Sequence, residues 1–86
     1  MLTPGVARTI HTPEHRRLVK LLRELREAAG LRQVELANRL GRNQSFVSKY
    51  ESGERRLDLV ELRAICEALD TNIVELVRAW APGDLG

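Results

Sequence analysis

Residues 33–53 have the sequence QVELANRLGRNQSFVSKYESG, which predicts two short helices joined by a tight turn. We expect helices at about 33–40 and 44–52, because each half carries apolar residues about one helical turn apart. These residues are Leu36, Ala37, Leu40, Val47 and Tyr50. Gly41 fits the turn, since glycine adopts a positive φ at little steric cost. The other side chains of the second helix are mostly polar, so one of its faces is predicted to be exposed.

Three positions in this unit have a steric reason of their own. Ala37 lies where the two helices should cross closely, so a methyl group fits there and a larger side chain would push them apart. Val47 and Tyr50 lie one turn apart and should hold the second helix against the core.

A longer helix is predicted before this unit, and residues 1–12 before it lack any helical period. Thr12 suits the N-cap, Pro13 the first helical position and Glu14 the first turn, while Gly30 suits the stop. The shared apolar face of this helix consists of Leu18, Leu21, Leu22 and Leu25. Residues 1–12 are therefore predicted to form a flexible arm, made weakly basic by Arg8.

Two more helices are predicted after the central unit. Asp58 and Glu61 have the spacing of a capping box at the start of the first. Its apolar stripe is Leu59, Leu62, Ile65, Cys66 and Leu69. Thr71 or Asn72 can cap the second. Its apolar set is Ile73, Leu76, Val77 and Trp80. No strand pattern appears, so we predict an all-α fold of five helices, with one domain at residues 13–81 and a tail at 82–86.

Composition excludes several classes of protein. Cys66 is the single cysteine, so no internal disulfide can form, and no apolar run approaches the ~20 residues that span a bilayer. His11 and His15 have no cysteine or second carboxylate at metal-ligand spacing. No nucleophile–base pair or phosphate loop is evident. We therefore expect a cytoplasmic protein with no membrane segment, no cofactor, no metal site and no catalytic residues.

The net charge of +2 is unevenly distributed along the chain. Residues 1–56 carry 12 Lys and Arg against 6 Asp and Glu, whereas residues 57–86 carry 2 against 6. A basic face suggests a polyanion as partner. An uneven but merely solvated surface explains the charge equally well.

The run GLRQVELANRLGRNQSFVSKYESGERRL, residues 30–57, resembles the lambda-repressor-like, Cro/XRE family of helix-turn-helix DNA-binding domains. The resemblance extends from about Leu18 to Val77. It implies a bacterial or phage transcriptional regulator, located with the nucleoid, that places the helix at 44–52 in the major groove of double-stranded DNA. It also implies a homodimer that binds an inverted repeat.

The resemblance assigns roles to individual residues. The implied base contacts are Gln44, Ser45, Ser48 and Lys49. The implied phosphate contacts are Gln33, Arg42, Asn43, Arg55 and Arg56. Lys49 could also bind phosphate, Asn43 could instead cap its helix, and Gln33 could be a cap, with or without a phosphate contact. Arg42 departs from the family, which usually has a small apolar residue there; its stem can cover the core while its guanidinium reaches water or phosphate.

Other implied roles are structural. Arg26 and Glu51 match a buried ion pair of some family members, although both could be exposed and contribute little. They join Ala37, Gly41, Val47 and Tyr50 as structural positions. Phe46 lies between the buried and exposed faces and could be half exposed. It could touch a thymine methyl group or a sugar, or pack on the turn, and packing is the favoured arrangement.

The last helix is the candidate dimer surface, through Ile73, Leu76, Val77 and Trp80. Alternatively, Trp80 only closes the core. A rival function is a protein-interaction module such as an antitoxin or anti-activator, whose binding surface would be the last helix and the acidic second half. No separate domain for a small-molecule ligand is expected.

Overall fold

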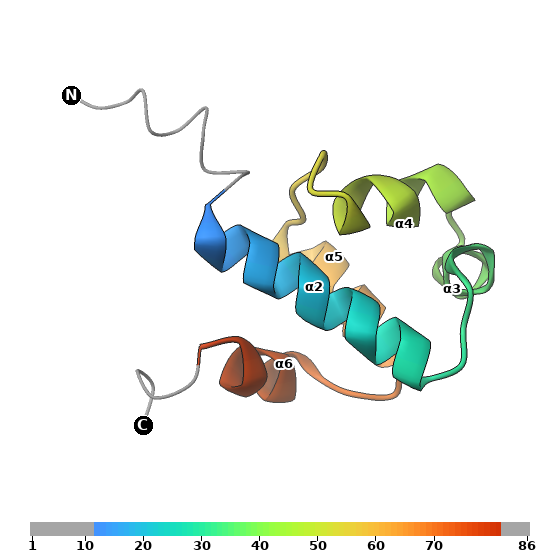
Figure 1. The fold of residues 1–86 in the computed structure, drawn as a ribbon. Helices are drawn as coiled ribbons and strands as arrows, with labels where there is room; N and C mark the ends of the chain where they lie inside the picture. Colours follow the sequence, from blue (N-terminus) through green and yellow to red (C-terminus); the bar gives the residue numbers. More distant parts are fainter. Residues whose placement is uncertain (1–11, 82–86) are drawn as a thin grey trace.

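The computed structural model describes residues 12–81, and all regular structure within this range is helical. The helices are α2 (Pro13–Ala28), α3 (Gln33–Leu40), α4 (Gln44–Glu51), α5 (Leu59–Ala68) and α6 (Ile73–Trp80). The predicted all-α fold is confirmed, and the five predicted helices are the ones found within the described residues. Figure 1 shows α2 lying between α4 and α6, with α3 beside α4 at one edge of the molecule. The predicted arm, apart from Thr12, and the predicted tail lie outside the described residues.

The helix ends follow the capping signals in the sequence. Thr12 Oγ1 accepts a hydrogen bond from the backbone N of His15 at 3.1 Å, which confirms Thr12 as the N-cap of α2. The backbone after α2 turns at Gly30, where φ is +75°. Asn72, and not Thr71, caps α6, because Asn72 Oδ1 accepts from Glu75 N at 2.9 Å.

The turn between α3 and α4 is left-handed at Gly41, where φ is +68°. The backbone N of Arg42 donates to the carbonyl of Ala37 at 2.9 Å, closing the end of α3. A Cβ at position 41 would meet no atom within 4 Å, so the requirement for glycine comes from the backbone conformation and not from crowding. α4 ends at Glu51, one residue before the predicted boundary, and Ser52 is its C-cap.

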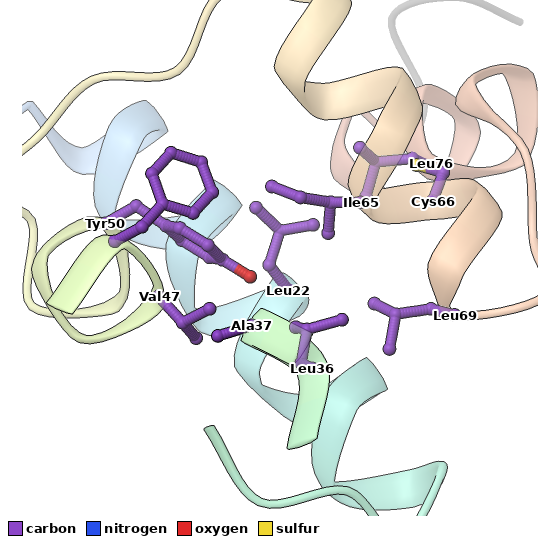
Figure 2. Close-up of a cluster of buried hydrophobic side chains, with 10 residues drawn as sticks. Leu22, Leu36, Ala37, Val47, Tyr50, Ile65, Cys66, Leu69 and Leu76 are labelled. Atoms are coloured by element: carbon purple, nitrogen blue, oxygen red, sulfur yellow. The ribbon is translucent and has the colours of Figure 1, made fainter. Parts of the chain in front are cut away.

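The core is aliphatic apart from two rings and draws on every described helix (Figure 2). Its fully buried side chains include Leu22, Leu36, Val47, Tyr50, Ile65 and Cys66. Cys66 fills a core position as a small apolar residue, and burial raises the pKa of its thiol.

Two predictions about the core were wrong. Leu59 is 69% exposed, because it is the first residue of α5 and lies beyond the layer where α5 packs on the other helices. Phe46 is only 6% exposed and is not half exposed, because its ring packs edge-on against Tyr50 and is covered by Arg42 and Arg55. Since Arg42 lies in the turn after α3, the favoured alternative, in which Phe46 packs on the turn, is confirmed. Along residues 12–81, no helix has the length and apolar character needed to cross a membrane.

Candidate nucleic-acid interface

α4 has one buried face and one polar, solvent-facing face. Phe46, Val47 and Tyr50 point into the core. Gln44, Ser45 and Lys49 are exposed, and Ser48 is half-buried. Because α4 lies at the outer edge of the molecule (Figure 1), the polar side chains on its outward side are accessible to a large partner.

The first residues of α3 and α4 are joined through their side chains. Gln44 Nε2 donates a hydrogen bond to Gln33 Oε1 at 3.3 Å, and Gln33 Nε2 donates to Glu51 Oε1 at 3.0 Å. The amide of Gln44 is thus connected to the opposite end of its own helix through Gln33. This arrangement limits the orientations of Gln44 while leaving its Oε1 and one N–H for a partner.

The chain of hydrogen bonds ends at a buried ion pair between α2 and α4. Arg26 Nε and Nη2 donate to the two oxygens of Glu51 at 2.7 and 3.0 Å, and Arg26 Nη1 donates to the carbonyl of Leu31 at 2.7 Å. The two side chains are only 9% and 4% exposed. The hydrogen bonds to Glu51 raise the pKa of the Arg26 guanidinium. This bidentate ion pair holds α4 against α2.

Asn43 occupies the N-cap position of α4, but its side chain makes no capping hydrogen bond. Its Oδ1 instead accepts a hydrogen bond from the hydroxyl of Ser45. Its carbonyl accepts from the backbone N of Phe46 at 3.1 Å. Of the two roles considered for the Asn43 side chain, the cap is therefore not formed here.

Arg42 and Arg55 lie on either side of α4 along the chain, and both contact Phe46 and Glu61. The guanidinium carbons lie 3.9 and 4.9 Å from the centroid of the Phe46 ring. Arg55 donates to both oxygens of Glu61, at 3.0 and 2.8 Å, and Arg42 Nη1 lies 3.8 Å from Glu61. The predicted phosphate ligand Arg55 is thus already paired, and Arg56 beside it is exposed.

Sequence reasoning missed this part of the site. Glu61 was recognised only as a capping residue, and the structure bears out that role: its side chain accepts from Asp58 N at 3.0 Å. Its contact with Arg55 depends on the path of residues 52–58, which no periodic pattern encodes. The signal in the sequence that could have indicated this cluster is the pair of arginines, Arg42 and Arg55, on either side of Phe46.

The apolar residues predicted as a dimer surface do not share one environment. Leu76 is 3% exposed and belongs to the core, so it is not available at the surface. Ile73, Val77 and Trp80, together with the buried Leu76, line a groove of about 380 Å³ that also includes Leu57 and Leu59. Trp80 Nε1 donates to the carbonyl of Glu14 at 2.8 Å, tying α6 to the start of α2.

Val74, which sequence reasoning did not select, is 55% exposed on the outer side of α6. Leu59 and Val60 are exposed at the start of α5.

Among the described residues, no group of three His, Cys, Asp or Glu side chains is arranged to hold a metal ion.

Comparison with known proteins identifies the fold. The model of the helix-turn-helix domain family matches residues 17–80. An XRE-family like protein from Pseudomonas syringae pv. tomato str. DC3000 is 46% identical, with 88% of this chain and 93% of that chain covered and a TM-score of 0.78. No curated protein sequence matches the chain.

Two more distant solved structures share the fold alone. The clp gene regulator ClgR from Corynebacterium glutamicum is 23% identical, covering 81% of this chain and 90% of that one, with a TM-score of 0.73. A point mutant of the restriction-modification controller protein C.Esp1396I is 20% identical, covering 86% and 94%, with a TM-score of 0.76.

Proposed function

This chain belongs to the Cro/XRE-like helix-turn-helix family, and on this premise we propose that it binds a specific double-stranded DNA sequence as a homodimer. Membership of this family makes it a DNA-binding transcriptional regulator and not an enzyme. The proposal adds which DNA bases α4 contacts, which residues bind the DNA phosphates and how two copies of the protein form a dimer.

The observation that carries the proposal is the exposed polar face of α4, held on a rigid support. A recognition helix must present base-reading side chains in a defined geometry, since a loose site gives affinity without discrimination. Gln44 is connected through Gln33 to the buried pair of Glu51 and Arg26. This supports Gln44 as a reader of adenine, through its Oε1 and its remaining N–H.

The other polar residues of α4 complete the proposed readout. Ser45 and Ser48 accept or donate to several bases, and Lys49 reaches guanine or a phosphate. Gln33 lies at the N-terminus of α3, where backbone N–H groups and the helix dipole favour an anion, and it is proposed to bind a phosphate. Asn43, Arg42, Arg55 and Arg56 are the other proposed phosphate ligands.

We propose that α6 and the groove beside it form the dimer interface. Val74, Val77 and Trp80 are exposed or partly exposed there, and an apolar face of this kind is stabilised by burial. Binding of such a dimer to an inverted repeat requires the two copies of α4 to lie about 34 Å apart, one turn of DNA.

Selection from a pool of random duplexes tests this function without knowledge of the operator. The expected result is enrichment of a two-fold symmetric sequence whose half-sites are about one helical turn apart. A pool that stays random after repeated selection would contradict sequence-specific binding.

The exposed residues Leu59 and Val60 favour a second candidate, in which the domain holds a protein partner as an antitoxin or anti-activator does. The DNA upstream of its own gene separates the two functions. A gel shift with that DNA at low salt supports the regulator that acts through DNA. Absence of any shift supports the protein-binding module.

A further inference from the structure

A single carboxylate holds the two arginines that flank α4. Glu61 of α5 accepts two hydrogen bonds from Arg55, at 3.0 and 2.8 Å, and lies 3.8 Å from Arg42. Phe46 of α4 completes the arrangement, because both guanidiniums lie on its ring. Two positive charges are therefore gathered around one negative charge, at the surface where DNA is proposed to bind.

The positions of the two arginines make them natural ligands for the DNA backbone. Arg42 immediately precedes the N-cap of α4, and Arg55 follows the end of the helix. A helix in the major groove has a phosphate backbone on each side, so cations near its two ends face phosphates. Both guanidiniums remain partly exposed, which leaves them accessible to a competing anion.

Glu61 is fixed in place and remains ionised. It is the N3 residue of a capping box, with its carboxylate accepting from Asp58 N at 3.0 Å and its own N donating to Asp58 Oδ1 at 2.7 Å. Its side chain is 18% exposed. The hydrogen bonds from Arg55, followed by the one from the Asp58 backbone, lower its pKa. It cannot swing away when DNA approaches without giving up the cap of α5.

We propose that Glu61 competes with DNA phosphates for Arg42 and Arg55 and thereby lowers the DNA affinity of the domain. An arginine that turns fully to a phosphate gives up the charge-assisted hydrogen bonds or the ion pair that it has with Glu61, and one that stays with Glu61 has part of its charge neutralised. The carboxylate also repels phosphates brought near it. This inference rests on the proposed DNA-binding function and adds a residue that tunes it.

Neutralising the carboxylate tests the competition directly. Glu61→Gln keeps an oxygen acceptor for the α5 cap and removes the charge. The probe is a mixed-sequence duplex of about 20 base pairs, because backbone contacts do not require the operator. We expect Glu61→Gln to bind about fivefold more tightly at ~0.1 M NaCl, and the slope of log affinity against log salt to become more negative by about one to two.

Two controls separate local competition from a general change of charge. Glu67→Gln removes the same charge from the far end of α5, where Glu67 pairs with Arg63 at 3.2 Å, and should change affinity less than about twofold. In a background with Arg42→Ala and Arg55→Ala, the gain from Glu61→Gln should fall to the level of Glu67→Gln. Thermal unfolding followed by circular dichroism checks that each variant is folded.

Each outcome bears on the proposal. If Glu61 instead orients the arginines towards phosphate, Glu61→Gln binds more weakly than wild type, and the proposal is overturned. Equal binding overturns it too. If Glu61→Gln is unfolded, Glu61→Asp, which keeps the charge but is too short to hold both arginines, must still gain affinity. A wild-type protein that binds no duplex at low salt refutes the proposed function itself.

Discussion

Gln44 donates a hydrogen bond to Gln33 at 3.3 Å, which joins the first residue of α4 to the first residue of α3. The contact matters because Gln33 in turn donates to Glu51, whose carboxylate is buried against Arg26. The exposed end of α4 and the interior of the protein are therefore parts of one hydrogen-bonded network. This network yields a prediction about stability and, at its exposed end, one about base readout.

Arg26→Met should destabilise the protein strongly. The substitution keeps much of the side-chain volume but leaves the buried Glu51 carboxylate without its charged partner, at a cost of about 3–5 kcal/mol in the free energy of unfolding. Denaturant unfolding measures the change. Arg23→Met breaks the exposed pair with Glu27 and serves as control, with an expected loss below about 0.5 kcal/mol. Equal losses for the two variants would show that the buried Arg26–Glu51 pair contributes no more to stability than the exposed Arg23–Glu27 pair.

Tyr50→Phe should leave stability unchanged or raise it by up to about 1 kcal/mol. The Tyr50 hydroxyl points into the cluster towards Leu22 (Figure 2) and has no hydrogen-bond partner among the described residues. Removing a buried polar group without a partner relieves a desolvation cost. The same denaturant experiment applies, and a loss above about 1 kcal/mol would indicate a partner that the hydroxyl gains in solution.

The same tyrosine predicts an alkaline limit to stability. Burial raises the pKa of Tyr50 above its ordinary value of about 10, because the phenolate would be desolvated. The unfolded chain therefore loses the proton first, so this contribution to stability is complete below pH ~10 and is lost as the pH rises further. The free energy of unfolding, measured from pH 8 to about 11, should fall more steeply for wild type than for Tyr50→Phe. Parallel curves would contradict the burial of the ring.

Arg56→Ala tests the proposed backbone contacts apart from the Glu61 cluster. We expect binding to specific and mixed-sequence DNA to weaken by a similar factor, and the slope of log affinity against log salt to become less negative by about one. Arg63→Ala, an exposed arginine on α5, is the control and should leave the slope unchanged. A selective loss on specific DNA would reassign Arg56 to base readout.

The dimer proposal can be tested at Val74, whose exposed position means that substitution should not disturb the core. Wild type should scatter light as a dimer at micromolar concentration, and Val74→Glu should shift the equilibrium to monomer, because a buried unpaired carboxylate opposes association. A dilution series that shows only monomer for wild type would refute the dimer.

The helices and their caps could be predicted because their signals are local. Thr12, Asp58 and Gly41 each act on backbone groups within a few residues. The exposure of Leu59 could not be predicted, because it depends on how residues 52–58 carry the chain from α4 to α5. Likewise, an apolar stripe on α6 does not tell which of its members, such as Leu76, faces the core.

The prediction of the Arg26–Glu51 contact came from family resemblance, and its geometry comes from the structure. Twenty-five positions separate the two residues, a distance over which sequence alone specifies no contact. The link from Glu51 through Gln33 to Gln44 also needed the structure, because it requires the starts of α3 and α4 to be close. The base contacts themselves stay predictions.

Titration of wild type and Gln44→Ala against two duplexes tests the central claim that α4 reads DNA bases. One duplex carries the sequence selected by the wild-type protein, and the other is of mixed sequence. We expect Gln44→Ala to lose about 1–3 kcal/mol of affinity for the selected duplex, roughly 5- to 150-fold, while its affinity for the mixed duplex changes little. An equal loss on both duplexes, or no loss on either, would contradict base readout by Gln44.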